Sequence, residues 1–335
     1  MSSLSLSPTP KDLSITPRDM RFGRDDRQGR WWLNGDPIAS AFHTALSVTF
    51  PRGEAMFIEA VKAHRDGVPE KLAREIRAFT QQEVIHSREH VVFNKKAAEA
   101  GYDLSELEDD VNQVLDLIKQ RPQIVNLMAT IALEHYTAMM AAVMLKDPRM
   151  YAGAEPEWAA LWKWHAIEEI EHKGVAYDTW LHATRDWSRF RRWRAKSIMM
   201  LLVTTRFWPK RVKGMKALLR QDGLTGWRVT ARIWWYLLGK PGVLRRSFLP
   251  WLSYFLPGFH PWNHDDRALI KLHESDYADA VMPQHSSAAA EHGTRNWRRL
   301  PPDRLAKAEP PKGSLSPVFG ASPSRDQRLA ARRVR

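Results

Sequence analysis

The chain has 335 residues, of which 44% are hydrophobic, so it is long enough for one large domain or two ordinary ones. Cysteine is absent, which excludes disulfide scaffolds, iron–sulfur clusters and cysteine nucleophiles and leaves His, Asp and Glu to hold any metal. The 51 Lys and Arg residues outnumber the 38 Asp and Glu residues, and the formal charge of +13 predicts an anionic partner.

The N-terminal sequence predicts a cytoplasmic protein. Residues 1–14 contain neither the basic segment nor the apolar segment of a secretory signal. The apolar run around residues 198–203 is far shorter than the roughly 18 residues that a membrane-crossing helix needs.

The first predicted helix belongs to a chain that is expected to be almost entirely helical, because strand-like alternation of side chains is nearly absent. This helix begins at Asp36 and Pro37, an N-cap residue followed by a proline at the first helical position. Residues 51–53 interrupt the helix, and it ends near His64.

Three further long helices are predicted at residues 70–100, 122–147 and 156–184, each of which starts at or just after a proline. A short acidic helix follows Asp103. Four long helices joined by short or moderate connections predict an all-α fold built on an antiparallel four-helix bundle, with additional C-terminal helices.

Composition divides the chain into four segments. Residues 1–30 are polar and predict a flexible arm, and residues 31–184 form the bundle. Residues 185–282 are predicted to be a basic, Trp-rich helical extension packed on the bundle, because their first sixty or so residues hold seventeen Lys and Arg against two acidic residues. Residues 283–335 lack periodicity and are predicted to be disordered.

The second long helix carries a polar stripe of Glu83, His86 and His90 in the string QQEVIHSREH. At about 100° per residue, the three side chains lie on one narrow side of the helix. Glu83 and His86 form a Glu-x-x-His motif that predicts metal ligation. His90 is a candidate proton shuttle, with ligation as the alternative.

The fourth long helix carries a matching stripe of His165, Glu169 and His172 in the string WHAIEEIEHK. Glu169 and His172 repeat the Glu-x-x-His motif on the same side of the helix. His165 is either a further ligand or a core histidine beside Trp162 and Trp164, and we favour the ligand.

The first and third long helices each contribute one glutamate, Glu54 and Glu134, within apolar sequence. Buried carboxylates need compensation, and one Glu from each of two helices plus Glu-x-x-His from each of the other two is the donor set of dimetal bundles. We therefore predict two metal ions in the bundle core. Glu59 is the alternative ligand on the first long helix. We prefer Glu54, because Glu54 directly follows the helix interruption.

Neighbouring polar residues are assigned other roles. Glu89, Glu168 and Glu171 point away from the two stripes and are expected to be solvated or to support the ligands from behind. His135, next to Glu134, is expected to be a packed or supporting residue. An apolar substrate pocket is expected to include Phe57, Met139 and Trp164.

Residues 20–265 resemble a bacterial family described as predicted metal-dependent hydrolases, which implies a ferritin-like bundle. The matching strings are GDPIASAFHTALSVTFPRGE, QQEVIHSREH, ALEHYTA, LWKWHAIEEIEHKGVAYD and PGFHPWNHDD. The spacing of His165, Glu169 and His172 is more distantly similar to that of the di-iron arylamine N-oxygenases, in which the extra histidine is a seventh ligand.

Two chemistries fit the predicted centre. The first is oxidation of a small organic substrate by a di-iron oxygenase or oxidase. The second is hydrolysis by a metal-bound hydroxide, as the family description implies. We favour oxidation, because Asp is missing from every proposed ligand position and the ligand pattern resembles that of di-iron oxygenases. Iron is the expected metal, and manganese and zinc are the alternatives.

The basic, Trp-rich residues 185–262 allow three interpretations. They cap the bundle with Trp and Leu while Arg faces water, or they contact an anionic membrane on its inner face, with Trp at the interface. Nucleic-acid binding is the least favoured, because no nucleic-acid-binding motif is visible. A non-enzymatic metal-binding or membrane-associated protein is therefore a third functional class. The oligomeric state is not indicated.

Overall fold

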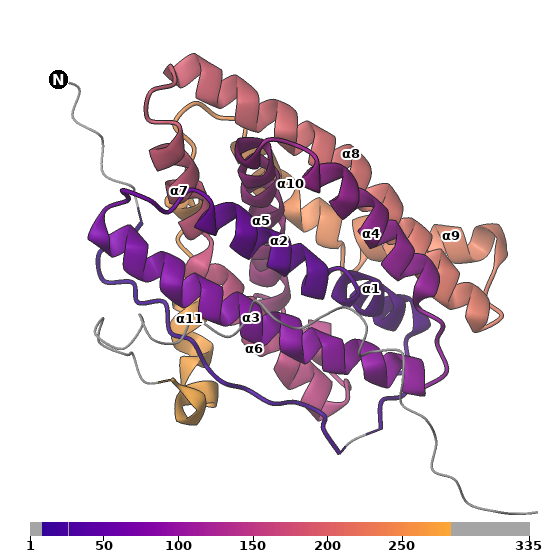
Figure 1. Ribbon diagram of the computed structural model, residues 1–335. Coiled ribbons are helices and arrows are strands. Elements are labelled where there is room, and N and C mark those ends of the chain that lie inside the picture. Colours follow the sequence, from indigo (N-terminus) through magenta and orange to yellow (C-terminus); the bar gives the residue numbers. More distant parts are fainter. Residues whose placement is uncertain (1–8, 26, 283–335) are drawn as a thin grey trace, which may run out of the picture. The chain divides into compact units, whose positions relative to one another are not determined.

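Helices make up most of the described part of the chain, which comprises residues 9–25 and 27–282 of the computed structural model (Figure 1). No strand occurs in these residues, which contain only two isolated β-bridges. The predicted all-α fold is therefore confirmed. Residues 1–8 of the predicted arm and the whole predicted disordered tail, residues 283–335, lie outside the described residues.

The bundle is formed by α2 (Phe50–Lys62), α3 (Glu70–Glu99), α5 (Gln123–Leu145) and α6 (Pro156–His172). Helix α2 packs against α3 and α5, and α6 packs against the same two helices. Each of the four helices therefore has two neighbours from the set, as the predicted four-helix bundle requires.

The start of the first helical region follows the predicted capping, but the interruption lies elsewhere. The Asp36 carboxylate accepts hydrogen bonds from the backbone N–H groups of Ile38 (2.8 Å) and Ala39 (3.3 Å) at the start of α1 (Pro37–Ser47). The break falls at residues 48–49 rather than 51–53. Pro51 lies in the first turn of α2, where its missing N–H has no helical acceptor in any case.

The predicted fourth helix is divided in two. Helix α6 ends at His172, and α7 (Val175–Ala183) begins after Gly174. A Cβ atom on Gly174 would lie 3.0 Å from the Trp262 ring, which is tighter than ordinary packing. The apolar periodicity continues through both helices, so it gave no sign of the break.

The N-terminal segment is part of the core rather than a flexible arm over its described length. Ile15 and Phe22 are buried, and the Arg18 side chain is 3% exposed. The backbone N–H of Met282 donates to the carbonyl of Pro17 at 2.9 Å. Ordered packing thus begins well before residue 31. The physical reason is that buried acidic groups on the bundle need the cation that this segment supplies.

The remaining helices surround the bundle. They are α4 (Ser105–Lys119), α8 (Arg189–Gln221), α9 (Gly226–Trp234), α10 (Val243–Ser253) and α11 (Arg267–His273), with the π-helical turn η2 (Trp235–Gly239) and the 3-10 turns η1 (Pro148–Tyr151), η3 (Pro261–Asn263) and η4 (Glu274–Ala280). Helix α8 packs on α1 and α5, and α10 packs on α5. Within residues 185–282, α8 and α10 thus cover the bundle on the side of α5, and α11 packs on α6.

Helix α5 is, among the described helices, the one that is long and apolar enough to cross a membrane. Most of its surface is buried inside the protein, as expected of the central helix of a bundle. Its apolar composition is thus explained by its neighbours, since α2, α6, α7, α8 and α10 all contact it.

Candidate metal centre

Seven polar side chains from four helices meet in the centre of the bundle. They are Glu54 of α2, Glu83 and His86 of α3, Glu134 of α5, and His165, Glu169 and His172 of α6. Each is at most 3% exposed. These are the seven residues that the sequence predicts as ligands, and the structure brings all of them together. Glu59, the rival of Glu54, is exposed on the other side of α2.

The ligating atoms fall into two overlapping groups. In each group, one donor atom from every residue lies within 4.8 Å of the others. The first group comprises Glu54, His86, His165 and Glu169, and the second comprises Glu83, Glu169 and His172. Glu134 lies beside the second group without belonging to it, with its Oε2 3.6 Å from His172 Nε2. Glu169 belongs to both groups and would therefore be a ligand common to two ions.

His172 turns one ring nitrogen inward and has the other held from outside. Its Nδ1 lies 2.9 Å from Oε1 of Gln82, which is an acceptor, so Nδ1 carries the proton. Its Nε2 lies 3.0 Å from a Glu83 oxygen and 3.6 Å from a Glu169 oxygen. Fixing the outer nitrogen in this way sets the tautomer that metal-ligating histidines use.

His86 is oriented in the same manner with the two nitrogens exchanged. Its Nε2 lies 3.0 Å from Oε2 of Glu168. Its Nδ1 faces the centre, 3.9 Å from Glu83 and 3.8 Å from Glu169. Glu168 therefore acts as the outer partner of a candidate ligand.

His165 points its ring toward the carboxylates, as the ligand interpretation requires. Its Nε2 lies 2.8 Å from Oε1 of Glu169, and its Nδ1 lies 2.6 Å from Nε2 of His90. Nδ1 of His90 lies in turn 2.8 Å from Oγ of Ser47. His90 thus stands behind His165 and is not a member of either donor group.

The three additional glutamates are buried and paired, so of the two roles expected for them, solvated or supporting the ligands from behind, the structure excludes the first. Arg18 donates to Glu168 at 3.1 Å and to Glu171 at 2.7 Å. Glu89 accepts from Arg24 at 2.5 Å and from Arg88 at 2.6 Å.

Sequence reasoning missed Arg18, which comes from far outside the bundle helices. The signal that could have found it is an excess of carboxylates on α3 and α6 beyond the number that two ions would bind, since buried charges require partners. Sequence reasoning also missed Gln82. This residue links His172 to Glu171, to which its amide donates at 2.8 Å.

Burial and mutual repulsion govern the carboxylates of the centre. Burial, followed by the charge of Glu83, raises the pKa values of Glu54 and Glu134 well above the usual range. Burial opposes a charge on His172, but the carboxylates of Glu169 and Glu83 raise its pKa well above the usual range. The four ligand carboxylates match the charge of two divalent cations, which would remove the repulsion.

The residues present fit two metal ions, because many of the atoms aimed at the centre have no hydrogen-bond partner. Within the described residues, the buried atoms without a hydrogen-bond partner include Glu54 Oε1, both carboxylate oxygens of Glu83 and of Glu134, His86 Nδ1 and Glu169 Oε2. Buried polar atoms are rarely left unsatisfied in proteins. A cluster of such atoms on four helices indicates cation binding.

His135 has a structural role, as predicted. Its Nε2 lies 3.1 Å from the carbonyl oxygen of Pro250. Its ring packs on Tyr254 and Phe259 at centroid distances of 5.1 Å and 5.0 Å. It points to the outer side of α5, away from the donor groups.

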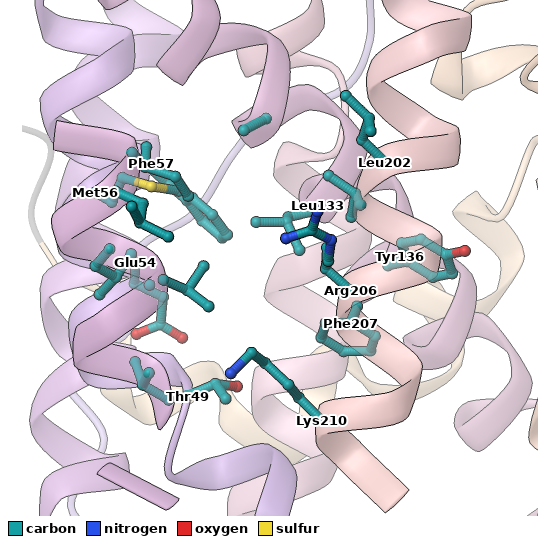
Figure 2. A pocket seen from close by; sticks show the side chains of 18 of the residues that line it. Thr49, Glu54, Met56, Phe57, Leu133, Tyr136, Leu202, Arg206, Phe207 and Lys210 are labelled. Carbon is teal, nitrogen blue, oxygen red and sulfur yellow. The ribbon is translucent and has the colours of Figure 1, made fainter. Parts of the chain in front are cut away.

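An apolar cavity of about 390 Å³ lies beside the centre, between α2, α4, α5 and α8. Figure 2 shows Glu54, Phe57 and Leu133 around it, with Arg206 and Lys210 of α8 reaching into the same space. Phe57 was expected in this lining and is present, whereas Met139 and Trp164 were also expected and do not line the cavity. The volume falls in the range of about 300–1,000 Å³ that is usual for small-molecule sites.

A second cavity, of about 20 Å³, adjoins His165 and Glu169. It shares Leu46, Phe50 and Thr137 with the lining of the larger cavity. A space of this size holds about one water molecule. The smaller cavity thus lies beside the donor groups, and the larger one lies next to Glu54.

Comparison with known proteins identifies a family but no characterised relative. A family model described as "predicted metal-dependent hydrolase" matches residues 16–265. The matched range includes all four bundle helices and Arg18. Neither the curated proteins nor the solved structures contain a match.

Proposed function

The chain belongs to the family of predicted metal-dependent hydrolases, and from this premise we propose that it is an enzyme whose reaction takes place beside two metal ions. The first ion would be held by Glu54, His86, His165 and Glu169, and the second by Glu83, Glu134, Glu169 and His172. The observation that carries the proposal is the cluster of inward-facing donor atoms without hydrogen-bond partners in the described part of the chain.

We propose oxidation of an organic substrate as the reaction. The donor set contains only Glu and His on a four-helix bundle, which is typical of carboxylate-bridged di-iron proteins. Similarity to the di-iron arylamine N-oxygenases in the spacing of His165, Glu169 and His172 also supports it. Two ferrous ions would supply two of the four electrons that reduce dioxygen, the substrate would supply the other two, and an external electron donor would return the ferric ions to the ferrous state.

The larger cavity is the proposed substrate site. Its apolar walls, which include Phe57 and Leu133, would bind the body of the substrate and exclude water. Glu54 is part of the same lining, so a bound molecule would lie against a ligand of the first ion. Arg206 and Lys210 would orient a negatively charged group.

The pair of His165 and His90 is the proposed proton path. His165 Nδ1 and His90 Nε2 lie 2.6 Å apart, so one of these nitrogens can donate a hydrogen bond to the other. Ser47 Oγ donates to Asn94 Oδ1 at 2.7 Å and can therefore accept from His90 Nδ1 at 2.8 Å at the far end. A proton can therefore leave the ligand side of the centre without crossing the apolar cavity.

Hydrolysis is the second candidate, and the family description favours it. Two closely spaced cations would activate water and polarise an ester or phosphoester. Arg206 and Lys210 at the cavity would suit an anionic ester group. In that reaction zinc, manganese or iron would serve, with no need for dioxygen.

Metal reconstitution distinguishes the two reactions. Protein loaded anaerobically with ferrous iron should bind two ions per chain, take up dioxygen on exposure to air and change its absorption spectrum. Zinc-loaded protein should neither consume dioxygen nor cleave p-nitrophenyl acetate or p-nitrophenyl phosphate. Ester cleavage by the zinc form, with no oxygen uptake by the iron form, would assign hydrolysis instead.

Two matched variants test the site itself. Glu54→Gln should reduce the metal content toward one ion per chain, because it removes a carboxylate of the first group. Glu59→Gln, on the exposed side of the same helix, should keep two ions. Equal metal content in both variants would contradict the assignment of Glu54.

A further inference from the structure

Helices α8 and α10 expose a concentration of large apolar side chains on the surface of the protein. These are Phe190, Ile198 and Leu201 of α8, Phe248 and Leu252 of α10, and Leu256 just beyond it, each at least 47% exposed. We call this surface the α8–α10 face. Scattered exposed apolar residues are normal, but a contiguous group of them marks an interaction site.

Contacts between the two helices make these residues one surface. The indole N–H of Trp251 on α10 donates to Thr204 of α8 at 3.0 Å. The indole N–H of Trp193 on α8 donates to the carbonyl of Phe255 at 2.7 Å. Rings of Phe248 and Trp251 lie 6.0 Å apart. The exposed residues of both helices therefore border a shared seam of half-buried aromatic rings.

Basic residues are interleaved with and adjacent to the apolar residues. Arg194 lies one turn from Phe190 and one turn from Ile198, on the same side of α8. The exposed basic residues on the face and on the adjoining α9 and η2 segments include Arg191, Arg194, Arg228, Arg232, Lys240 and Arg245. None of these six forms an ion pair with an acidic side chain of the described residues. Their positive charge is therefore available to a partner.

We propose that the α8–α10 face docks on the surface of an anionic membrane. Exposed Leu and Phe side chains can enter the hydrocarbon edge of a bilayer, while Arg and Lys contact the lipid headgroups. Exposed tryptophans at the end of this region, Trp227 and Trp235, are the residue type that concentrates at the membrane interface. A cytoplasmic leaflet with anionic lipids offers hydrocarbon to the apolar side chains and negative headgroups to the basic ones.

Charge argues against the other occupants of this face. A second copy docked through the same face would bring its basic residues against those of the first. Residues 283–335 also contain more basic than acidic residues, so they would be repelled. Nucleic acid would satisfy the arginines but would leave the aliphatic side chains of Leu201, Leu252 and Leu256 without an apolar partner.

Vesicle binding by the full chain tests the proposal. The protein should co-sediment with vesicles of phosphatidylcholine mixed with phosphatidylglycerol and should not co-sediment with phosphatidylcholine alone. The triple variant F248S/L252S/L256S should partition about tenfold or more weakly, and so should R191Q/R194Q, since each basic residue adds to the attraction. All five positions are exposed, so folding should be preserved.

Two control variants carry the same chemical changes on another surface. Val84 and Val91 of α3 are exposed to a similar degree, and V84S/V91S should bind vesicles like the unmodified protein. R74Q/R77Q, which also removes two exposed arginines on the same helix, is the control for charge. Full binding by the triple variant, or no binding to anionic vesicles by the unmodified protein, would overturn the proposal. A dimer that only the triple variant loses would assign the face to a second copy.

Discussion

Each histidine of the centre has one nitrogen facing the carboxylates and the other held by a polar neighbour. The neighbours differ in kind: an amide at Gln82, a carboxylate at Glu168 and an imidazole at His90. A carboxylate partner makes a ligand histidine more basic, whereas an imidazole partner offers a path for a proton. The three candidate ligand histidines should therefore differ in basicity and in their ability to pass on a proton.

The pH dependence of stability follows from Glu134 in metal-free protein. Burial, with the charge of Glu83, raises its pKa well above the usual value. In the usual carboxyl range and above it, the unfolded chain loses this proton while the folded protein keeps it, so stability is lost as the pH rises. Glu134→Gln stays neutral, and in chelator it should be more stable than the unmodified protein at pH 8 by about 1–3 kcal/mol.

Urea unfolding in chelator at pH 5 and at pH 8 measures this difference, which should shrink at the lower pH. Glu59→Gln should show no such dependence, because Glu59 is exposed. With metal present the order should reverse, since Glu134→Gln removes a ligand. A metal-free Glu134→Gln protein that is less stable than the unmodified protein at pH 8 would contradict the argument.

The spacing of residues along one helix indicated five of the seven candidate ligands, and the single glutamates Glu54 and Glu134 were indicated by their apolar surroundings. Glu83 and His86 on α3, like Glu169 and His172 on α6, point the same way because three residues nearly complete a helical turn. Spacing within one helix carries no information about a partner on another segment. The roles of Arg18 and Gln82 therefore became visible only in the structure. The structure was also needed to place His90 behind His165, at a distance of 2.6 Å between their ring nitrogens.

Helix starts were predictable from local chemistry, and helix breaks were not. Asp36 and the prolines at 69, 122 and 156 mark starts because they satisfy or lack N–H groups at the first turn. The break at Gly174 depends on the close approach of Trp262, which lies far along the chain. The N-terminal segment was likewise misassigned, because its apolar residues are few and its role depends on the acidic groups it covers.

Arg18 links the N-terminal segment to helix α6. Replacing it by Met leaves the buried carboxylates of Glu168 and Glu171 without their cation. Breaking a buried ion pair in this way costs about 3–5 kcal/mol of stability. Urea unfolding should show this loss, and the loss of the Glu168 contact geometry should also weaken metal binding through His86.

Arg21→Met is the matched control for this prediction. Arg21 pairs with Asp19 on the surface, with its side chain 60% exposed, so its removal should cost less than about 1 kcal/mol. Adding Glu171→Gln to Arg18→Met should recover part of the stability, because the two residues are coupled. Equal effects of the two arginine substitutions would show that the segment is not a structural part of the centre.

Across the whole molecule, α8 connects the centre, the cavity and the surface. Arg206 and Leu202 line the cavity, and Leu202 is also 49% exposed. Leu201, the next residue back, belongs to the α8–α10 face. The proposed substrate site therefore opens beside the proposed membrane surface, which favours an apolar substrate with an anionic group.

The cavity can be tested without knowledge of the substrate by filling it. Leu133 of α5 projects into the cavity in Figure 2, and Leu133→Trp would occupy part of the 390 Å³ while leaving the donor groups intact. Binding of anilinonaphthalene sulfonate, an apolar anion, should weaken about tenfold or more, as expected when a pocket no longer accommodates its ligand. Metal content should remain at two ions per chain.

Leu272→Trp, at an exposed position on α11, should change neither the dye affinity nor the metal content. Unchanged dye affinity in Leu133→Trp would mean that this cavity is not where an apolar anion binds.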